Sequence, residues 1–204
     1  SLAGIATVPH SLIRMQSGNL AYITRRIDRS KKNKLHMEDM CQLTERLIED
    51  KYKGSYEHIG KAILKYAANS VLDLTNFFEQ VLFSYLTGNA DMHLKNFSLI
   101  EQPGTGFVLA PAYDMVASAL VVQGDNEERA LNFNGKKRKI QRKDFDTVFS
   151  SFNALEEKAI RNMYSKFSNV IESWLQFIPK SFIDQPLQEQ FAQLIQQRAK
   201  VLGL

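Results

Sequence analysis

Apolar residues recur along this chain with two different periods, and the changes of period divide it into expected strands and helices. The stretches 11–16 and 20–27 are strand-like and are joined by a Ser-Gly-Asn turn, which predicts a β-hairpin. The stretches 97–100 and 107–109 flank a turn of about five residues that includes a proline and two glycines. They predict a second hairpin in the middle of the chain.

Helical periodicity covers most of the remaining chain. A first helix is predicted from residue 37, with the apolar residues between Met40 and Ile48 on one face, and Ser55 is placed to cap the next helix. The apolar face from Leu74 to Leu86 is so wide that its helix is expected to be largely buried, and Gly88 is placed to end it. This pattern predicts an α+β fold that is mostly helical. Further helices are predicted with caps or first turns at Asp144, Asn153 and Pro186.

Polar segments separate these elements. The charged residues 31–34 and the polar residues 123–129 are expected to be exposed loops. The basic run 136–143 is interpreted first as a solvated loop, while contact with nucleic-acid phosphates or with an acidic protein stays open. Because no aromatic residues alternate with these basic ones, single-stranded nucleic acid is not an expected ligand.

Composition narrows the class of protein. A chain of 204 residues suffices for one domain, or for one large lobe with a fragment of another. The net charge of +4 permits acidic partners without demanding them. Cys41 stands alone, which favours a reducing compartment such as the cytoplasm. The longest apolar run, 115–122, is too short to cross a bilayer, and the first residues do not resemble a signal peptide.

Side chains suited to metal and phosphate chemistry gather after the long apolar helix. Asp91 and Asn96 stand five positions apart, with His93 and Lys95 between them, and Asp114 follows Asn96 by 18 residues across the second hairpin. Enzymes that transfer phosphoryl groups use one Asp to orient the attacking hydroxyl, and an Asn and a second Asp to hold Mg²⁺. Asp91 alone would more simply be a turn residue, but the joint pattern favours a kinase site.

Four segments, taken in order, resemble the HipA-like toxin kinases. The catalytic signature of that family resembles residues 88–98, and its metal-binding segment resembles residues 111–114. Residues 26–29 and 37–42 resemble the strand-to-linker segment and the helix start that follows it. The resemblance implies the C-terminal lobe of a protein-kinase-like fold. It also implies a bacterial serine/threonine kinase that is the toxin component of a toxin–antitoxin module.

The resemblance implies a role for each residue of the central motif. Asp91 would be the catalytic base or would orient the acceptor hydroxyl, and Lys95 would offset charge on the transferring phosphoryl group. Asn96 and Asp114 would bind Mg²⁺ and, through it, the phosphates of ATP.

Four further residues are implied to contact the nucleotide. His93 and Tyr113 would lie close to it, although Tyr113 is interpreted equally well as a core aromatic residue. The segment from Arg25 to Ile27 would form the hinge that meets adenine. Ile27 stands where the family usually has Phe, so this chain departs from the pattern and lacks an aromatic contact at that position.

The same resemblance divides the chain. Residues 1–30 would be the remnant of an N-lobe hairpin with the hinge, and residues 31–204 the helical C-lobe that carries the catalytic loop and the metal-binding segment. No G-x-G-x-x-G phosphate loop occurs in the sequence, and the strand Lys of the family is missing. We therefore expect the chain alone to be incomplete as a kinase and to phosphorylate little.

Partners follow only from the resemblance. It implies a protein substrate, with an aminoacyl-tRNA synthetase as the best-known kind, and a helix-turn-helix antitoxin that binds the kinase and operator DNA. Direct contact with DNA would be weak and made through residues 136–143. Two other functions stay open: a catalytically silent module that binds antitoxin, and a kinase of small molecules. A zinc site and a Ser–His–Asp hydrolase are not expected, because suitably spaced Cys ligands and a G-x-S-x-G motif are absent from the sequence.

Overall fold

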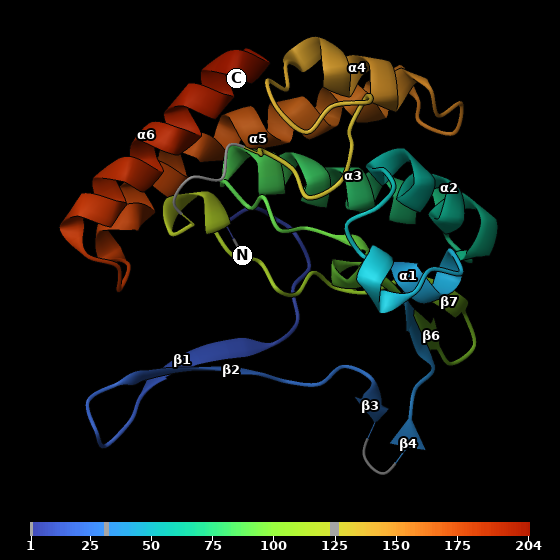
Figure 1. The fold of residues 1–204 in the computed structure, drawn as a ribbon, viewed down its shortest axis with the longest axis horizontal. Helices are drawn as coiled ribbons and strands as arrows, with labels where there is room; N and C mark the ends of the chain where they lie inside the picture. The colour runs from blue at the N-terminus through green and yellow to red at the C-terminus, as the bar shows by residue number, and fades with distance from the viewer. Residues whose placement is uncertain (1, 31–32, 123–126) are drawn as a thin grey trace.

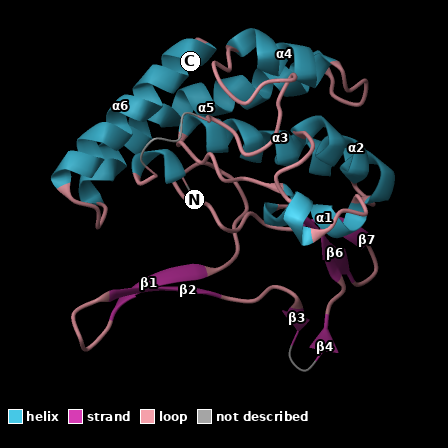
Figure 2. Ribbon diagram, in the orientation of Figure 1, coloured by secondary structure: helices cyan, strands magenta, loops and turns pink. Residues whose placement is uncertain are grey.

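The computed structural model describes residues 2–30, 33–122 and 127–204. Its helices gather in one body, and its short antiparallel sheets lie along one side of that body (Figures 1 and 2). This arrangement confirms the predicted α+β class with a helical majority. None of the helices in the described part of the chain is long and apolar enough to cross a membrane.

The N-terminal hairpin is present as predicted. Strand β1 (His10–Arg14) pairs antiparallel with β2 (Leu20–Thr24), and Gly18 in the turn has a φ of +86°. Gly suits this position because a Cβ makes such a φ costly. The hairpin projects from the helical body in Figure 1, and its side chains are mostly exposed.

A second small pair follows the hairpin. Strand β3 (Arg29–Ser30) pairs with β4 (Asn33–Lys34), and both are exposed, as expected of this charged segment. Residues 31 and 32, which belong to the same predicted loop, lie outside the described residues.

The central sheet has three strands. Strand β6 (Ser98–Gln102) pairs antiparallel with β7 (Gly106–Leu109), which confirms the second hairpin. Its turn has fewer residues than expected, because Gln102 already pairs with Gly106. Strand β5 (Met37–Asp39) adds to the other edge of β6 and gives the sheet the order β5-β6-β7.

Strand β5 overturns the helix predicted from residue 37. Only α1 (Met40–Leu43) is helical there, with Asp39 as its N-cap. Leu47 and Ile48 are 72% and 62% exposed instead of forming a buried helical face. The physical reason is that the free edge of β6 offers backbone hydrogen bonds, which outweigh a local helical pattern.

Two helices support the motif at residues 88–96. Helix α2 (Tyr56–Tyr66) is capped by Ser55, whose Oγ accepts from the His58 backbone N–H, as predicted. Helix α3 (Ser70–Leu86) runs through the middle of the helical body, and its wide apolar face is buried as expected. Aromatic side chains from several elements pack on and around these two helices: Tyr56, Phe77, Phe78, Phe97, Phe133, Phe145 and Phe149.

The last third is helical, with shifted starts. Helix α4 (Arg142–Ser150) begins before Asp144, whose carboxylate accepts from the Gln141 backbone N–H. Helix α5 (Glu157–Phe177) begins after Glu156, so the predicted cap at Asn153 is wrong. Helix α6 (Gln185–Leu202) has Pro186 in its first turn, as predicted, and Asp184 as its cap. Four short 3-10 turns complete the elements of the described residues: Ile48–Asp50, Leu94–Asn96, Ser118–Leu120 and Ile178–Lys180.

The loop predicted at 123–129 is only partly testable, since residues 123–126 lie outside the described residues. At its end the prediction is wrong, because Arg129 is 0% exposed. Its guanidinium donates to the Val81 carbonyl of α3 at 2.8 Å and lies over the rings of Tyr56, Tyr85, Phe133 and Phe145. Contacts between a cation and aromatic faces offset part of the cost of burying the charge.

Candidate active site

The end of helix α3 positions the motif that begins at residue 88. Thr87 closes the helix, and the Gly88 N–H donates to the Tyr85 carbonyl at 3.3 Å. Gly88 has a φ of +75°, and a Cβ there would collide with Leu194 of α6, so this position requires glycine. The chain therefore leaves the buried helix α3 in a fixed direction where this motif begins.

Asp91 lies in the loop just beyond this helix. The Ala90 N–H donates to Ser118 Oγ at 2.9 Å, and the Asp91 N–H donates to Asn89 Oδ1 at 3.2 Å. Asp91 is half-buried, and its Oδ1 accepts a hydrogen bond of 2.9 Å from the Tyr52 hydroxyl. Its carboxylate is thus held in place while part of it still faces solvent.

Asn96 and Asp114 are in direct contact. Asn96 Nδ2 donates to Asp114 Oδ2 at 2.6 Å, while Asn96 Oδ1 accepts from the His93 backbone N–H at 3.2 Å. The β6–β7 hairpin brings Asp114 back across the chain to this position, as the sequence predicted. Asp114 is exposed and has a φ of +55°, a conformation that non-glycine residues adopt rarely and often at functional sites.

The Tyr52 and His93 rings meet edge to face with centroids 5.0 Å apart, and the Tyr52 hydroxyl donates to Asp91. Burial, then the hydrogen bond and charge of Asp91, then the charge of Asp114, raise the pKa of Tyr52 to about 12. The direct contacts therefore form two groups, Tyr52 with Asp91 and Asn96 with Asp114.

His93 is almost fully buried within this site. Burial lowers its pKa, and the Lys51 ammonium lowers it further, while Asp91 and Asp114 act in the opposite direction. Its ring is therefore neutral at pH 7. Nδ1 is buried and has no partner among the described residues, which leaves one polar atom ready for a ligand.

Carboxylate and amide oxygens such as those of Asp114 and Asn96 suit a hard divalent cation, although Asn96 turns its nitrogen toward Asp114 here and its amide would have to rotate to share an ion with it. Among the described residues, no group of three or more His, Cys, Asp and Glu side chains could hold a metal alone. Mg²⁺ fits this sparse set, because it keeps several waters and is usually bound through one or two carboxylates together with substrate phosphates. The residues present fit such an ion, and its binding stays a prediction.

Lys95 pairs with a carboxylate other than those of Asp91 and Asp114. Its Nζ makes a 2.7 Å ion pair with Asp39 Oδ2, and the hydrogen bond to Asp39 raises the pKa of Lys95. To offset charge on a phosphoryl group, as the resemblance implies, Lys95 would have to leave or share this ion pair.

Tyr113 is interpreted from the sequence both as a core aromatic residue and as a residue close to the nucleotide. Its ring packs against a small apolar cluster that includes Ile100 and Val108, and its hydroxyl hydrogen-bonds Ser98 Oγ at 2.5 Å and donates to the Lys95 carbonyl at 3.0 Å. Burial raises its pKa to about 12. The residue is therefore structural, and it also lies next to Asp114 at the edge of a cavity.

The hinge residues lie on the strand side of the site. Ile27 packs against the same small apolar cluster as Tyr113. Arg25 is exposed, and its backbone N–H donates to the Pro9 carbonyl at 2.8 Å. Their predicted contact with adenine is not tested by these contacts.

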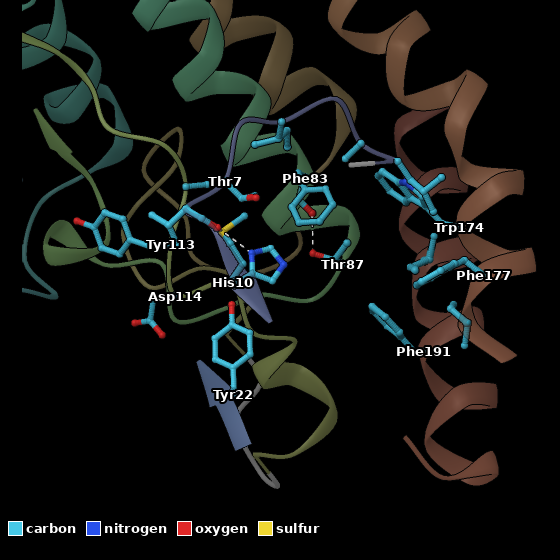
Figure 3. Close-up of a pocket in the computed structure, with 18 residues that line it drawn as sticks. Thr7, His10, Tyr22, Phe83, Thr87, Tyr113, Asp114, Trp174, Phe177 and Phe191 are labelled. Atoms are coloured by element: carbon cyan, nitrogen blue, oxygen red, sulfur yellow. Dashed lines mark hydrogen bonds between the residues drawn. The ribbon is translucent and has the colours of Figure 1, made fainter. Parts of the chain in front are cut away.

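A cavity of about 820 Å³ opens beside Asp114 (Figure 3). Tyr113 and Asp114 form one side, His10 and Tyr22 of the β1–β2 hairpin reach its rim, and the opposite wall is apolar. Asp91, His93 and Asn96 do not line it. The apolar wall comes from α3, α5 and α6, with Phe83, Trp174, Phe177, Phe191 and Ile195.

The sequence analysis missed two residues of this site, Tyr52 and Asp39. Tyr52 follows a 3-10 turn, and no periodicity or motif marks it. Asp39 does carry a local signal: it stands three positions before Gln42, and the two residues form a reciprocal capping box. The sequence could not reveal that Tyr52 contacts Asp91, which lies 39 positions away, or that Asp39 pairs with Lys95, which lies 56 positions away.

The basic run 136–143 is partly neutralised within the chain. Lys136 pairs with Asp144 at 2.7 Å, Lys137 with Glu127 at 3.2 Å and Arg142 with Asp146 at 3.1 Å. These pairs leave fewer free cations for an external phosphate than the sequence suggests.

Comparison with known proteins shows which family this sequence matches. The model of the HipA-like C-terminal domain matches residues 1–175. The candidate kinase Y4dM of Sinorhizobium fredii is 33% identical over 138 residues, which cover 67% of this chain and 32% of that protein. A candidate kinase of Haemophilus influenzae is 36% identical over 107 residues, 48% of this chain and 31% of that protein. The chain thus spans about a third of these relatives.

Two solved structures share the fold. Shewanella oneidensis HipA, in its complex with HipB and operator DNA, matches all of this chain and 53% of its own with a TM-score of 0.80 at 18% identity. The proinflammatory kinase CtkA of Helicobacter pylori matches 98% of this chain and 75% of its own with a TM-score of 0.64 at 13% identity. At these identities the likeness shows the fold.

Proposed function

Since this chain belongs to the family of HipA-like C-terminal domains, we propose that it is the catalytic C-terminal lobe of a kinase that phosphorylates Ser or Thr in a protein with ATP. The observation that carries the proposal is the contact of Asn96 with Asp114, which joins the loop of Asp91 and Asn96 to the segment after the β6–β7 hairpin. The kinase names of its relatives support the reaction class.

Each residue of the site has its own role in the proposed phosphoryl transfer. The acceptor oxygen forms a bond to the γ-phosphorus of ATP, and the bond from that phosphorus to the bridging oxygen breaks, so that its electron pair leaves with ADP. Asp91 orients the acceptor hydroxyl and receives its proton. Asn96 and Asp114 would hold Mg²⁺, which would neutralise charge on the phosphates.

Nucleotide contacts are assigned to the surrounding residues. The neutral ring of His93 offers Nδ1 as an unpaired polar atom, and Tyr113 stands beside Asp114 at the edge of the cavity. Arg25 and Ile27 form the hinge, with Ile27 giving an aliphatic contact in place of a ring.

A second lobe completes the site in this proposal. The chain spans 32% and 31% of two kinase-named relatives and 53% of the HipA structure, so those proteins carry a large further part. We assign residues 1–30 to the edge of that lobe and residues 31–204 to the C-lobe. The phosphate loop and the strand Lys belong to the further part, and the isolated chain binds Mg²⁺-ATP weakly.

The HipA complex with HipB and operator DNA supports a toxin–antitoxin role. In this role the protein is a cytoplasmic toxin, its partner is a helix-turn-helix antitoxin, and its substrate is a component of translation such as an aminoacyl-tRNA synthetase. Direct contact with DNA through residues 136–143 is weak, because three of the basic side chains there are already paired.

The test is phosphorylation by the longest natural polypeptide that contains this chain. Asp91→Asn and Asp114→Asn should each lower the rate by about 10²-fold or more, because each removes a group that positions the reacting atoms. Transfer of ³²P from ATP to protein measures the rate, and thermal unfolding checks that the fold is intact.

The matched control is Glu157→Gln, which changes a carboxylate that is 90% exposed on α5. It should leave the rate unchanged. Full activity in both Asp variants would show that the site is assigned wrongly. Turnover of a small acceptor without any protein substrate would favour a small-molecule kinase instead.

A further inference from the structure

The carboxylate of Asp91 depends on a residue that no kinase motif includes. Tyr52 donates its hydroxyl hydrogen to Asp91 Oδ1 at 2.9 Å. In the described part of the chain, this is the one hydrogen bond or ion pair made by the Asp91 side chain. The other carboxylate oxygen, Oδ2, has no protein partner there.

Lys95 and Asn96, which follow Asp91 in the same loop, are occupied elsewhere, while Asn89 contacts the Asp91 backbone N–H through its Oδ1. Lys95 pairs with Asp39 at 2.7 Å, and the Asn96 amide donates to Asp114 at 2.6 Å. Neither is available to orient Asp91 in this arrangement. The phenol of Tyr52 therefore supplies what these groups do not.

Three contacts hold Tyr52 and the residue before it in place. Its ring meets the His93 ring edge to face with centroids 5.0 Å apart, and the Lys51 ammonium lies 4.9 Å from the centre of its ring. The Lys51 carbonyl accepts from the Leu94 backbone N–H at 3.1 Å, so segment 51–52 is hydrogen-bonded to the catalytic loop. Tyr52 is therefore linked to this loop through both its hydroxyl and the backbone of its neighbour Lys51.

The phenol remains a hydrogen-bond donor at working pH. Burial, followed by the hydrogen bond and the charge of Asp91, raises the pKa of Tyr52 to about 12. It is consequently protonated throughout the neutral range, and it donates to the ionised carboxylate in a charge-assisted hydrogen bond.

We propose that Tyr52 is a positioning residue for phosphoryl transfer: its hydroxyl fixes Oδ1 of Asp91 so that Oδ2 receives the acceptor hydroxyl. The inference rests on the proposed function of Asp91. It adds that a side chain 39 positions upstream, outside every motif of the site, sets the geometry of the reacting atoms. A carboxylate free to rotate would spend less time in the productive orientation.

The first test is Tyr52→Phe in the longest natural polypeptide that contains the chain. The variant keeps the ring contact with His93 and loses the hydrogen bond. kcat should fall by about tenfold or more while KM for ATP stays within about twofold, because the hydroxyl touches Asp91 and not the nucleotide-binding residues. A purely structural loss would change KM and thermal stability as well.

Tyr66→Phe is a closely matched control. Tyr66 is 42% exposed, against 43% for Tyr52, and the Lys65 ammonium lies 4.7 Å from the centre of its ring. It lies at the end of α2 and makes no contact with Asp91. Its variant should keep wild-type kcat.

The second test needs no catalysis and uses the 204-residue chain itself. Tyrosine labelled with ¹³C at Cζ reports the titration of Tyr52 by NMR. Asp91→Asn preserves shape and removes the charge, so the pKa of Tyr52 should fall from about 12 toward its ordinary value. An unchanged titration would overturn the contact and the proposal with it.

The remaining outcomes separate the two levels of the argument. Absence of transfer by the wild-type polypeptide would overturn the proposed function. Equal kcat for wild type and Tyr52→Phe, with normal transfer, would overturn only the role of Tyr52. Phosphate found on Tyr52 itself by mass spectrometry would make it an acceptor and would also overturn the positioning role.

Discussion

At the scale of single residues, the candidate site is ordered by hydrogen bonds among its own side chains. Asn96 uses both ends of its amide, one on the His93 backbone and one on Asp114. Asp91 is held by Tyr52. Polar groups that are oriented before a ligand binds need less reorganisation in the transition state. This order is consistent with the proposed phosphoryl transfer.

A buried polar residue away from the site, Asp144, also stabilises the fold. Asp144 has a side chain that is only 1% exposed, and its carboxylate accepts from Asn134, from Lys136 and from the Gln141 backbone. Burial alone would raise its pKa, but these hydrogen bonds outweigh burial and hold the pKa below its ordinary value. Asp144 therefore ties the basic segment to helix α4.

Asp144→Asn should reveal this role through pH. A lowered folded-state pKa stabilises the fold above the unfolded-state pKa of about 4, and this contribution is lost as the pH falls through the folded-state pKa. We expect the variant to lose about 1–3 kcal/mol of unfolding free energy at pH 7. The difference from wild type should shrink below about pH 4.

Urea unfolding at several pH values measures the effect, with the exposed Glu189→Gln as a control that changes little at any pH. A difference between Asp144→Asn and wild type that stays constant from pH 7 to pH 3 would contradict this account.

At the scale of elements, the catalytic motif depends on how closely α2 and α3 pack. Gly60 lies in the middle of α2, and a Cβ added there would come within 2.7 Å of Phe152 Cζ and 3.2 Å of Leu74 Cδ1. Tyr56, one turn earlier, donates its hydroxyl to the Met92 carbonyl at 2.9 Å, inside the catalytic loop. Helix α2, packed on α3, thus supports the loop that contains Met92.

Gly60→Ala is expected to destabilise the protein despite the better helix propensity of Ala. Propensity favours Ala by about 1 kcal/mol, whereas overpacking a filled core costs about 1–3 kcal/mol. The net loss should appear in thermal or urea unfolding. Lys61→Ala, at the exposed neighbouring position, should be nearly neutral. A Gly60→Ala variant more stable than wild type would mean that Phe152 moves aside freely.

At the scale of the whole molecule, the chain combines a packed helical body with a hairpin that has little support. Strands β1 and β2 hold each other but bury almost none of their side chains, and Tyr22 is 64% exposed. Helix α3, by contrast, is buried along most of its length. Local stability should therefore differ sharply between these parts.

Hydrogen exchange of the isolated chain tests this contrast. Amides of β1 and β2 should exchange through local opening, while those of α3 should exchange only with global unfolding. The paired strands β6 and β7, which are partly buried, serve as an internal comparison for sheet hydrogen bonds. Equal protection in the N-terminal hairpin and in α3 would show that the hairpin is anchored more firmly than its exposure indicates.

The sequence by itself determined the elements whose causes are local. The Ser55 cap, the wide apolar face of α3, Gly88 after its end and the two hairpin turns all act within a few residues of the chain. The four segments 26–29, 37–42, 88–98 and 111–114, taken in order, were together sufficient to identify the family. Periodicity and capping need no distant partner, and so these predictions could be made from residue order alone.

The tertiary structure alone decided where distant partners meet. It turned residues 37–39 into a strand on the edge of β6, paired Lys95 with Asp39, buried Arg129 among aromatic rings and set Tyr52 on Asp91. In each case the deciding contact joins positions far apart in the chain. Its free energy depends on burial and geometry that exist only after folding, which residue order does not contain.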